Sequence, residues 1–190
     1  MRFLFLLLFL LYSNSSVADS AINTFFEYYD ISPKTKNDIK LEIQKNTPII
    51  NKSTKYHGKT SWQIEWDISW KQTNGICYLD ASEANLDVLF KMPRISPDFD
   101  AKNTVTIAFN RYYRALLKHE NGHRDNGIKA LTDIKRLLSN FASFSDCKVL
   151  NKAVESAITM IVGKYKHQDI AYDLQTKHGK LQGVSIKNFI

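Results

Sequence analysis

The chain has 190 residues, 44% hydrophobic and 24% charged, which is ordinary usage for a globular protein and predicts one domain. Its formal net charge of +7 comes from basic residues scattered among acidic ones. No dense Arg/Lys block or known reader motif is present, so we expect no nucleic-acid partner. We interpret the charge as a mildly basic surface, and attraction to an anionic cell-envelope polymer is the alternative.

The first residues predict a secretory signal peptide over residues 1–18, followed by a single domain over residues 19–190. Arg2 gives a positive start, Phe3–Tyr12 is apolar, and Ser16–Ala18 provides a small-residue cleavage site. The apolar run is far shorter than the ~20 residues that a membrane span needs. No later segment is long and apolar enough to span a membrane. We therefore expect a bacterial protein that is periplasmic or secreted, without a membrane span in the mature chain.

The mature chain contains two cysteines, Cys77 and Cys147. In an exported protein such a pair predicts one disulfide, whereas free buried thiols are the alternative. A disulfide that closes so long a loop stabilises the fold by roughly 4 kcal/mol.

The first half of the mature chain is predicted to be mainly strands. Phe25–Ile31 is aromatic and prone to β-structure, and Lys34–Lys45 favours a short helix. Ser61–Lys71 is the clearest element, because apolar and polar residues alternate strictly, as in a half-buried antiparallel strand. Thr73–Gly75 then turns the chain. Two further strand segments follow, Ile76–Ala81 as the hairpin partner and Asn85–Lys91.

Three tryptophans lie on one face of the predicted strand: Trp62, Trp66 and Trp70. We interpret this row as part of the core of the sheet, and a platform on which a ligand stacks is the alternative.

The second half is predicted to be helical. Apolar residues keep helical spacing from Leu116 to Phe141, Ser143–Asp146 breaks the pattern, and Val149–Gln175 resumes it. The sequence therefore predicts an α+β fold, in which a small antiparallel sheet in the N-terminal half precedes a long helical hairpin.

One stretch of the first predicted helix, residues 116–128, reads LLKHENGHRDNGI. Its two Asn-Gly pairs are strong turn signals, but the apolar spacing on both sides favours a helix. Each glycine inside a helix costs roughly 1 kcal/mol relative to alanine. We expect that Gly122 is present because the missing side chain lets another backbone pack closely.

The same stretch contains H-E-x-x-H, with His119, Glu120 and His123. Histidines four residues apart lie on one helix face, where both imidazoles can bind one Zn²⁺. Glu120 then lies beside a zinc-activated water and is predicted to be the general base. A catalytic zinc has three protein ligands and one open position, so a third ligand is expected elsewhere.

The helical hairpin narrows the choice of the third ligand. If the chain turns near Ser145, equal rise along both arms places residues 167–171 opposite the motif. His167, Asp169 and Asp173 remain candidates, and His178 is within reach if the helix ends just before it.

Several short patterns resemble one bacterial family. Besides H-E-x-G-H, they comprise Thr60-x-Trp62-x-x-x-Trp66, Pro93, the flanking cysteines, and Tyr172-Asp173, Thr176, His178-Gly179 and Gln182. Together they are similar to domain of unknown function 922, a family of predicted secreted zinc-dependent proteases, from about Tyr28 to Gln182.

The resemblance implies that the segment around Tyr172 to His178 forms the other half of a zincin-like site. It implies His178 as third ligand, Asp173 as alternative ligand or as a residue orienting a histidine, and Tyr172 as a hydrogen-bond donor to the oxyanion. We therefore expect a zinc metalloprotease acting on peptides or proteins. A non-catalytic cell-envelope binding module and a zinc amidase acting on peptidoglycan are the alternatives, and the oligomeric state is not predicted.

Overall fold

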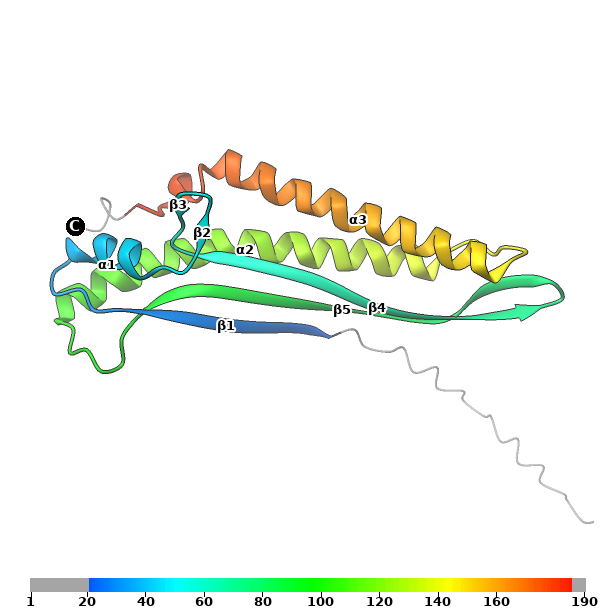
Figure 1. Cartoon of the computed structure of the whole chain (residues 1–190), viewed down its shortest axis with the longest axis horizontal. Helices are drawn as coiled ribbons and strands as arrows, with labels where there is room; N and C mark the ends of the chain where they lie inside the picture. Colours follow the sequence, from blue (N-terminus) through cyan, green and yellow to red (C-terminus); the bar gives the residue numbers. More distant parts are fainter. Residues whose placement is uncertain (1–20, 186–190) are drawn as a thin grey trace, which may run out of the picture.

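The computed structural model describes residues 21–185 and confirms the α+β fold. Two long helices run side by side along the long axis of the molecule, over a three-stranded sheet (Figure 1). The predicted signal peptide, residues 1–18, lies outside the described residues. None of the described helices is both long and apolar enough to cross a membrane.

The elements follow one another in this order: β1 (Ile22–Ile31), α1 (Asp38–Asn46), β2 (Ile50–Asn51), β3 (Thr54–Lys55), β4 (Lys59–Thr73), β5 (Ile76–Ile95), α2 (Asn103–Ser139), α3 (Cys147–Thr176) and the short 3-10 helix η1 (Lys180–Gln182).

The sheet has the order β1-β5-β4 and is mixed. β4 and β5 form the predicted antiparallel hairpin, and the two strand segments predicted after the turn are parts of the single strand β5. β1 pairs with β5 in parallel, which the expected antiparallel sheet did not include. The reason is that Ile31 at the end of β1 and Lys59 at the start of β4 both lie near the C-terminal end of β5. The chain therefore reverses there and returns on the other side of β5.

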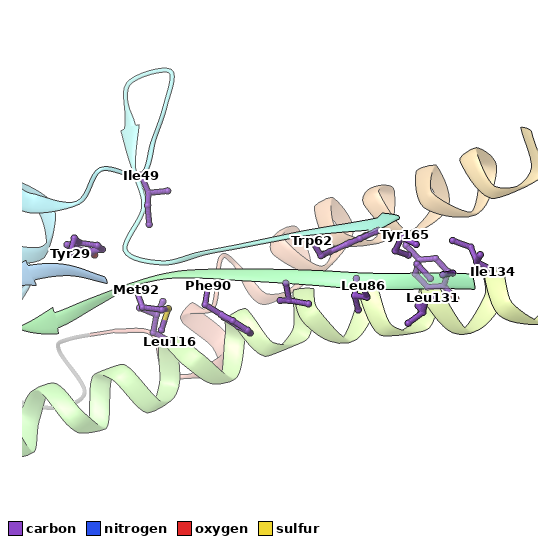
Figure 2. Packing of buried hydrophobic residues seen from close by; sticks show 14 of the residues in the cluster. Tyr29, Ile49, Trp62, Leu86, Phe90, Met92, Leu116, Leu131, Ile134 and Tyr165 are labelled. Atoms are coloured by element: carbon purple, nitrogen blue, oxygen red, sulfur yellow. The ribbon is translucent and has the colours of Figure 1, made fainter. Parts of the chain in front are cut away.

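The core lies between the sheet and α2 (Figure 2). One face of β5 is covered, so alternate residues are buried: Ala84, Leu86, Val88, Phe90 and Met92. Facing them, α2 buries apolar residues at helical spacing, among them Leu116, Leu131 and Ile134. Each such fully buried side chain contributes about 1.5–3 kcal/mol. This packing fixes the rotation of α2, and with it the direction of the side chains in its motif.

The tryptophan row belongs to the core only in part. Trp62 is 4% exposed, whereas Trp66 and Trp70 are 37% and 43% exposed. The core interpretation is therefore confirmed for Trp62 alone.

A disulfide joins Cys77 at the start of β5 to Cys147 at the start of α3, as predicted. Next to it, the backbone of Cys77 exchanges two hydrogen bonds with Phe144, of 2.6 and 2.8 Å. The carboxylate of Asp146 caps α3 by accepting a hydrogen bond of 2.6 Å from the amide of Lys148. These contacts fix where α3 begins, and therefore which of its residues lie opposite the motif in α2.

Candidate metal centre

The H-E-x-x-H motif lies within α2, which continues as a helix through both Asn-Gly pairs. Each of the two glycines lies against an aromatic ring. A Cβ atom at Gly122 would lie 2.2 Å from Cζ and Oη of Tyr172, and one at Gly127 would lie 3.0 Å from Cγ of Trp62. The neighbour of Gly122 is thus a side chain and not the backbone that we expected, and it leaves no room for a Cβ atom.

Asp169 and Asp173 lie one turn apart on α3, opposite His119 and His123 on α2. The Nε2 atoms of His119 and His123 each lie 3.2 Å from Oδ1 of Asp173. Among the described residues, these three side chains are the group whose potential ligand atoms all lie within 4.8 Å of one another. Zinc bonds of about 2.0–2.2 Å in a tetrahedral site separate the ligand atoms by about 3.3–3.5 Å, so the geometry fits a metal ion.

A closed ring of hydrogen bonds orients His119. Its Nδ1 lies 2.9 Å from Oε1 of Gln182, and Nε2 of Gln182 donates to the hydroxyl of Tyr172 at 2.8 Å. That hydroxyl donates to the carbonyl oxygen of His119 at 3.1 Å, while the Tyr172 ring stacks on the imidazole at 5.2 Å. With its Nδ1 proton directed at Gln182, His119 presents the Nε2 lone pair to the cluster.

The same hydrogen bonds determine where the hydroxyl of Tyr172 points. Its hydroxyl is directed at the backbone of His119 and at Gln182, and not at the atoms that would hold a metal. The close approach of the ring to Gly122 holds it alongside His119, and the role of Tyr172 as an oxyanion donor stays a prediction.

Asp169 orients His123 in a similar way. Its Oδ1 lies 3.1 Å from Nδ1 of His123 and accepts a second hydrogen bond of 2.8 Å from Asn126. Its Oδ2 accepts a hydrogen bond of 2.7 Å from the indole of Trp62. Burial lowers the pKa of His123, but the hydrogen bonds with Asp169 and Asp173 outweigh it and raise the pKa to about 9. The two carboxylates therefore make His123 more basic than a free imidazole, and Asp169 directs its Nε2 toward Asp173.

Glu120 is buried against β4. The hydroxyl of Thr60 lies 2.9 Å from its Oε2 and 3.1 Å from its carbonyl oxygen. A Cβ atom at Gly58 would lie 2.9 Å from its Oε1, so the residue at that position must be small. Burial raises the pKa of Glu120, and the hydrogen bond from Thr60 and the charge of His123 offset only part of that increase. The carboxylate therefore takes up a proton more readily than an exposed one.

His178 lies beside the cluster and not within it. Its Nδ1 is 3.6 Å from Oδ1 of Asp173, but His178 is not part of the group whose potential ligand atoms all lie within 4.8 Å of one another. α3 ends at Thr176, so His178 does not share the helix face that carries Asp169 and Asp173. The described structure thus brings together His119, His123 and the alternative ligand Asp173, and leaves the predicted third ligand outside.

Comparison with known protein families identifies the family of this chain. A model described as "Bacterial protein of unknown function (DUF922)" matches residues 26–179, which covers most of the chain. The chain belongs to the DUF922 family. The matched range of this DUF922 protein includes most of the sheet, His119, His123 and Asp173, but ends before Gln182. No curated protein and no solved structure matches it.

Two residues of the site, Thr60 and Gln182, received no role from the sequence beyond their part in the family resemblance. Asp169 was predicted as a candidate ligand, and not as the residue that orients His123. The spacing held a usable signal for Asp169: it lies four residues before Asp173, as His119 lies four before His123. In an antiparallel helix pair, two such pairs face each other.

Proposed function

We propose that this DUF922 protein is a zinc-dependent hydrolase that cleaves amide bonds in peptides or unfolded proteins. The observation that carries the proposal is the convergence of His119 Nε2, His123 Nε2 and Asp173 Oδ1 beside the buried Glu120. Two histidines and one carboxylate leave one of four positions open, which is typical of catalytic and not of structural zinc.

The chain's own groups supply the proton transfers. A bound zinc ion would provide the Lewis acid that acidifies water and polarises a carbonyl group. Glu120 accepts a proton from the attacking water and delivers it to the nitrogen of the leaving amine. Its raised pKa suits this role, since the same carboxylate must take up a proton and then release it. Thr60 holds Oε2 of that carboxylate in place.

An exported location, periplasmic or extracellular, belongs to the same proposal. The disulfide between Cys77 and Cys147 supports it, because such bonds persist in oxidising compartments outside the cytoplasm.

The test compares zinc content with turnover. The purified protein, reconstituted with zinc, is expected to hold about one ion per chain. Glu120→Gln should retain the zinc and lower the rate of hydrolysis of dye-labelled, unfolded casein by about 100-fold or more. Glu155→Gln is the control, because Glu155 lies on the exposed surface of α3. A wild-type protein that binds no zinc even after reconstitution would refute the proposal.

An experiment with a second substrate distinguishes a protease from a cell-wall amidase. Purified peptidoglycan is incubated with the same zinc-loaded protein. Release of peptides from peptidoglycan without cleavage of casein would change the substrate class to that of a cell-wall amidase.

A further inference from the structure

Three consecutive left-handed residues follow α3. Lys177 and His178 have φ of 50°, and Gly179 has φ of 77°. Glycine is required at the third position, because a Cβ atom there would lie 2.6 Å from Val184 and 2.9 Å from Cγ of His119. This turn reverses the chain so that Gln182 reaches His119, and it directs His178 over Asp173.

His178 adopts a conformation that a glycine adopts without steric cost. Non-glycine residues in this region are uncommon, and the exceptions gather at functional sites, where the surrounding structure holds the strain. The backbone contact here is a hydrogen bond of 2.8 Å from the amide of His178 to the carbonyl oxygen of Asp173, which glycine would make equally well. The backbone therefore gives no reason for a histidine here, and His178, unlike Lys177, lies beside Asp173.

The exposure of the side chains shows which side of the cluster is open. His119 and His123 are 6% and 10% exposed, whereas Asp173 is 32% and His178 is 50% exposed. A substrate therefore reaches the cluster from the side of Asp173 and meets His178 there. Within residues 21–185, Nδ1 of His178 pairs with Asp173 at 3.6 Å and no hydrogen bond holds Nε2, so Nε2 remains available to a ligand.

Tyr56 holds the other side of the His178 ring. The two rings meet edge to face, with their centroids 5.7 Å apart. Tyr56 is itself fixed, because its amide donates to Ile49 at 2.9 Å and its carbonyl accepts from the hydroxyl of Thr47 at 2.6 Å. The β2–β3 region and the end of α3 thus meet at this aromatic contact beside the open side of the cluster.

We propose that His178 contacts the substrate and not the metal: its imidazole donates a hydrogen bond to the carbonyl oxygen of the amide that is cleaved, and Tyr56 orients the ring. The inference rests on the proposed hydrolase function and assigns a substrate-binding group to that site. It also explains why a half-exposed histidine stands at a position that favours glycine.

The test uses two glycine variants of the full chain. His178→Gly removes the donor, and Lys177→Gly is the matched control, because Lys177 has the same φ and an exposed side chain. Neither variant should lower the unfolding midpoint, since glycine tolerates this conformation. With zinc bound, kcat for casein should fall about 100-fold to 1000-fold in His178→Gly, as for loss of one oxyanion donor, and remain unchanged in Lys177→Gly.

Zinc affinity, measured by competition with a chromophoric chelator, separates the possible failures. His178→Gly should bind zinc as the wild type does, whereas Asp173→Ala should lose it. If His178→Gly loses zinc, His178 is a ligand and the inference is wrong. If it keeps both zinc and kcat, the inference is wrong while the hydrolase proposal stands. If the zinc-loaded wild type cleaves no substrate, the hydrolase proposal itself fails, and the two zinc affinities still report the ligand set.

Discussion

Replacing Gly122 with alanine probes how tightly the Tyr172 ring packs against α2. A Cβ atom at this position would lie 2.2 Å from Cζ and Oη of Tyr172 and 2.6 Å from Cε1. Because Cβ contacts shorter than 3.0 Å are essentially never observed, the Tyr172 ring must move away from α2. Gly163 in α3 is the matched control, since nothing lies within 4 Å of a Cβ atom there.

The two variants should change stability in opposite directions. Alanine in a helix interior is favoured over glycine by about 1 kcal/mol, so Gly163→Ala should raise the melting temperature by about 2–4 °C. Overpacking costs about 1–3 kcal/mol, which offsets that gain at Gly122 or exceeds it. Displacing Tyr172 also breaks the hydrogen-bonded ring around His119, and losing such support weakens metal binding by about 10-fold to 100-fold.

The assay combines thermal unfolding of the metal-free proteins with zinc competition. Adding Tyr172→Ala should remove the clash, so that Gly122→Ala becomes stabilising in that background. If Gly122→Ala alone stabilises the fold as much as Gly163→Ala does and leaves zinc affinity unchanged, the packing argument is refuted.

Three further predictions concern other parts of the molecule. Because the pKa of His123 is about 9 without metal, zinc must displace its proton, and the affinity for zinc should increase about tenfold per pH unit between pH 7 and 9; chelator competition at several pH values measures this. Thr60→Val removes a hydrogen bond that lowers the pKa of Glu120, so the acidic limb of the pH–kcat/KM profile should move to higher pH. Reducing the disulfide between Cys77 and Cys147, or replacing both cysteines with alanine, should lower the free energy of unfolding by about 4 kcal/mol, measured by urea denaturation.

The helical half of the fold was predictable because its signals are local and periodic. Apolar spacing on both sides of the motif outweighed the two Asn-Gly turn signals, and the structure confirms the helix. Equal rise on both arms placed residues 167–171 opposite the motif, and Asp169 does contact His123. Helix geometry therefore predicted the position of Asp173, on the second helix of the site, to within one helical turn.

The features that could not be predicted depend on the backbone conformation of segments outside helices and strands. His178 was within reach of the cluster by counting residues, but the left-handed turn that places it beside Asp173 has no periodic signal. The parallel pairing of β1 likewise depends on where the chain returns through α1, β2 and β3, which a strand pattern does not encode. Gln182 reaches His119 only through that turn, so its contact was equally invisible.

The cluster and the residues that orient it come from two distant parts of the chain. His119 and His123 lie in the middle of the sequence, whereas Asp173 and the orienting residues Asp169 and Gln182 lie within residues 169–182. Because synthesis proceeds from the N-terminus, a chain made only as far as residue 168 contains both histidines but neither of the carboxylates opposite them. The cluster is complete only once Asp173 has been added, and His119 gains its hydrogen bond with Gln182 nine residues later. A chain that stalls or is cut before this segment therefore has both histidines but no complete cluster.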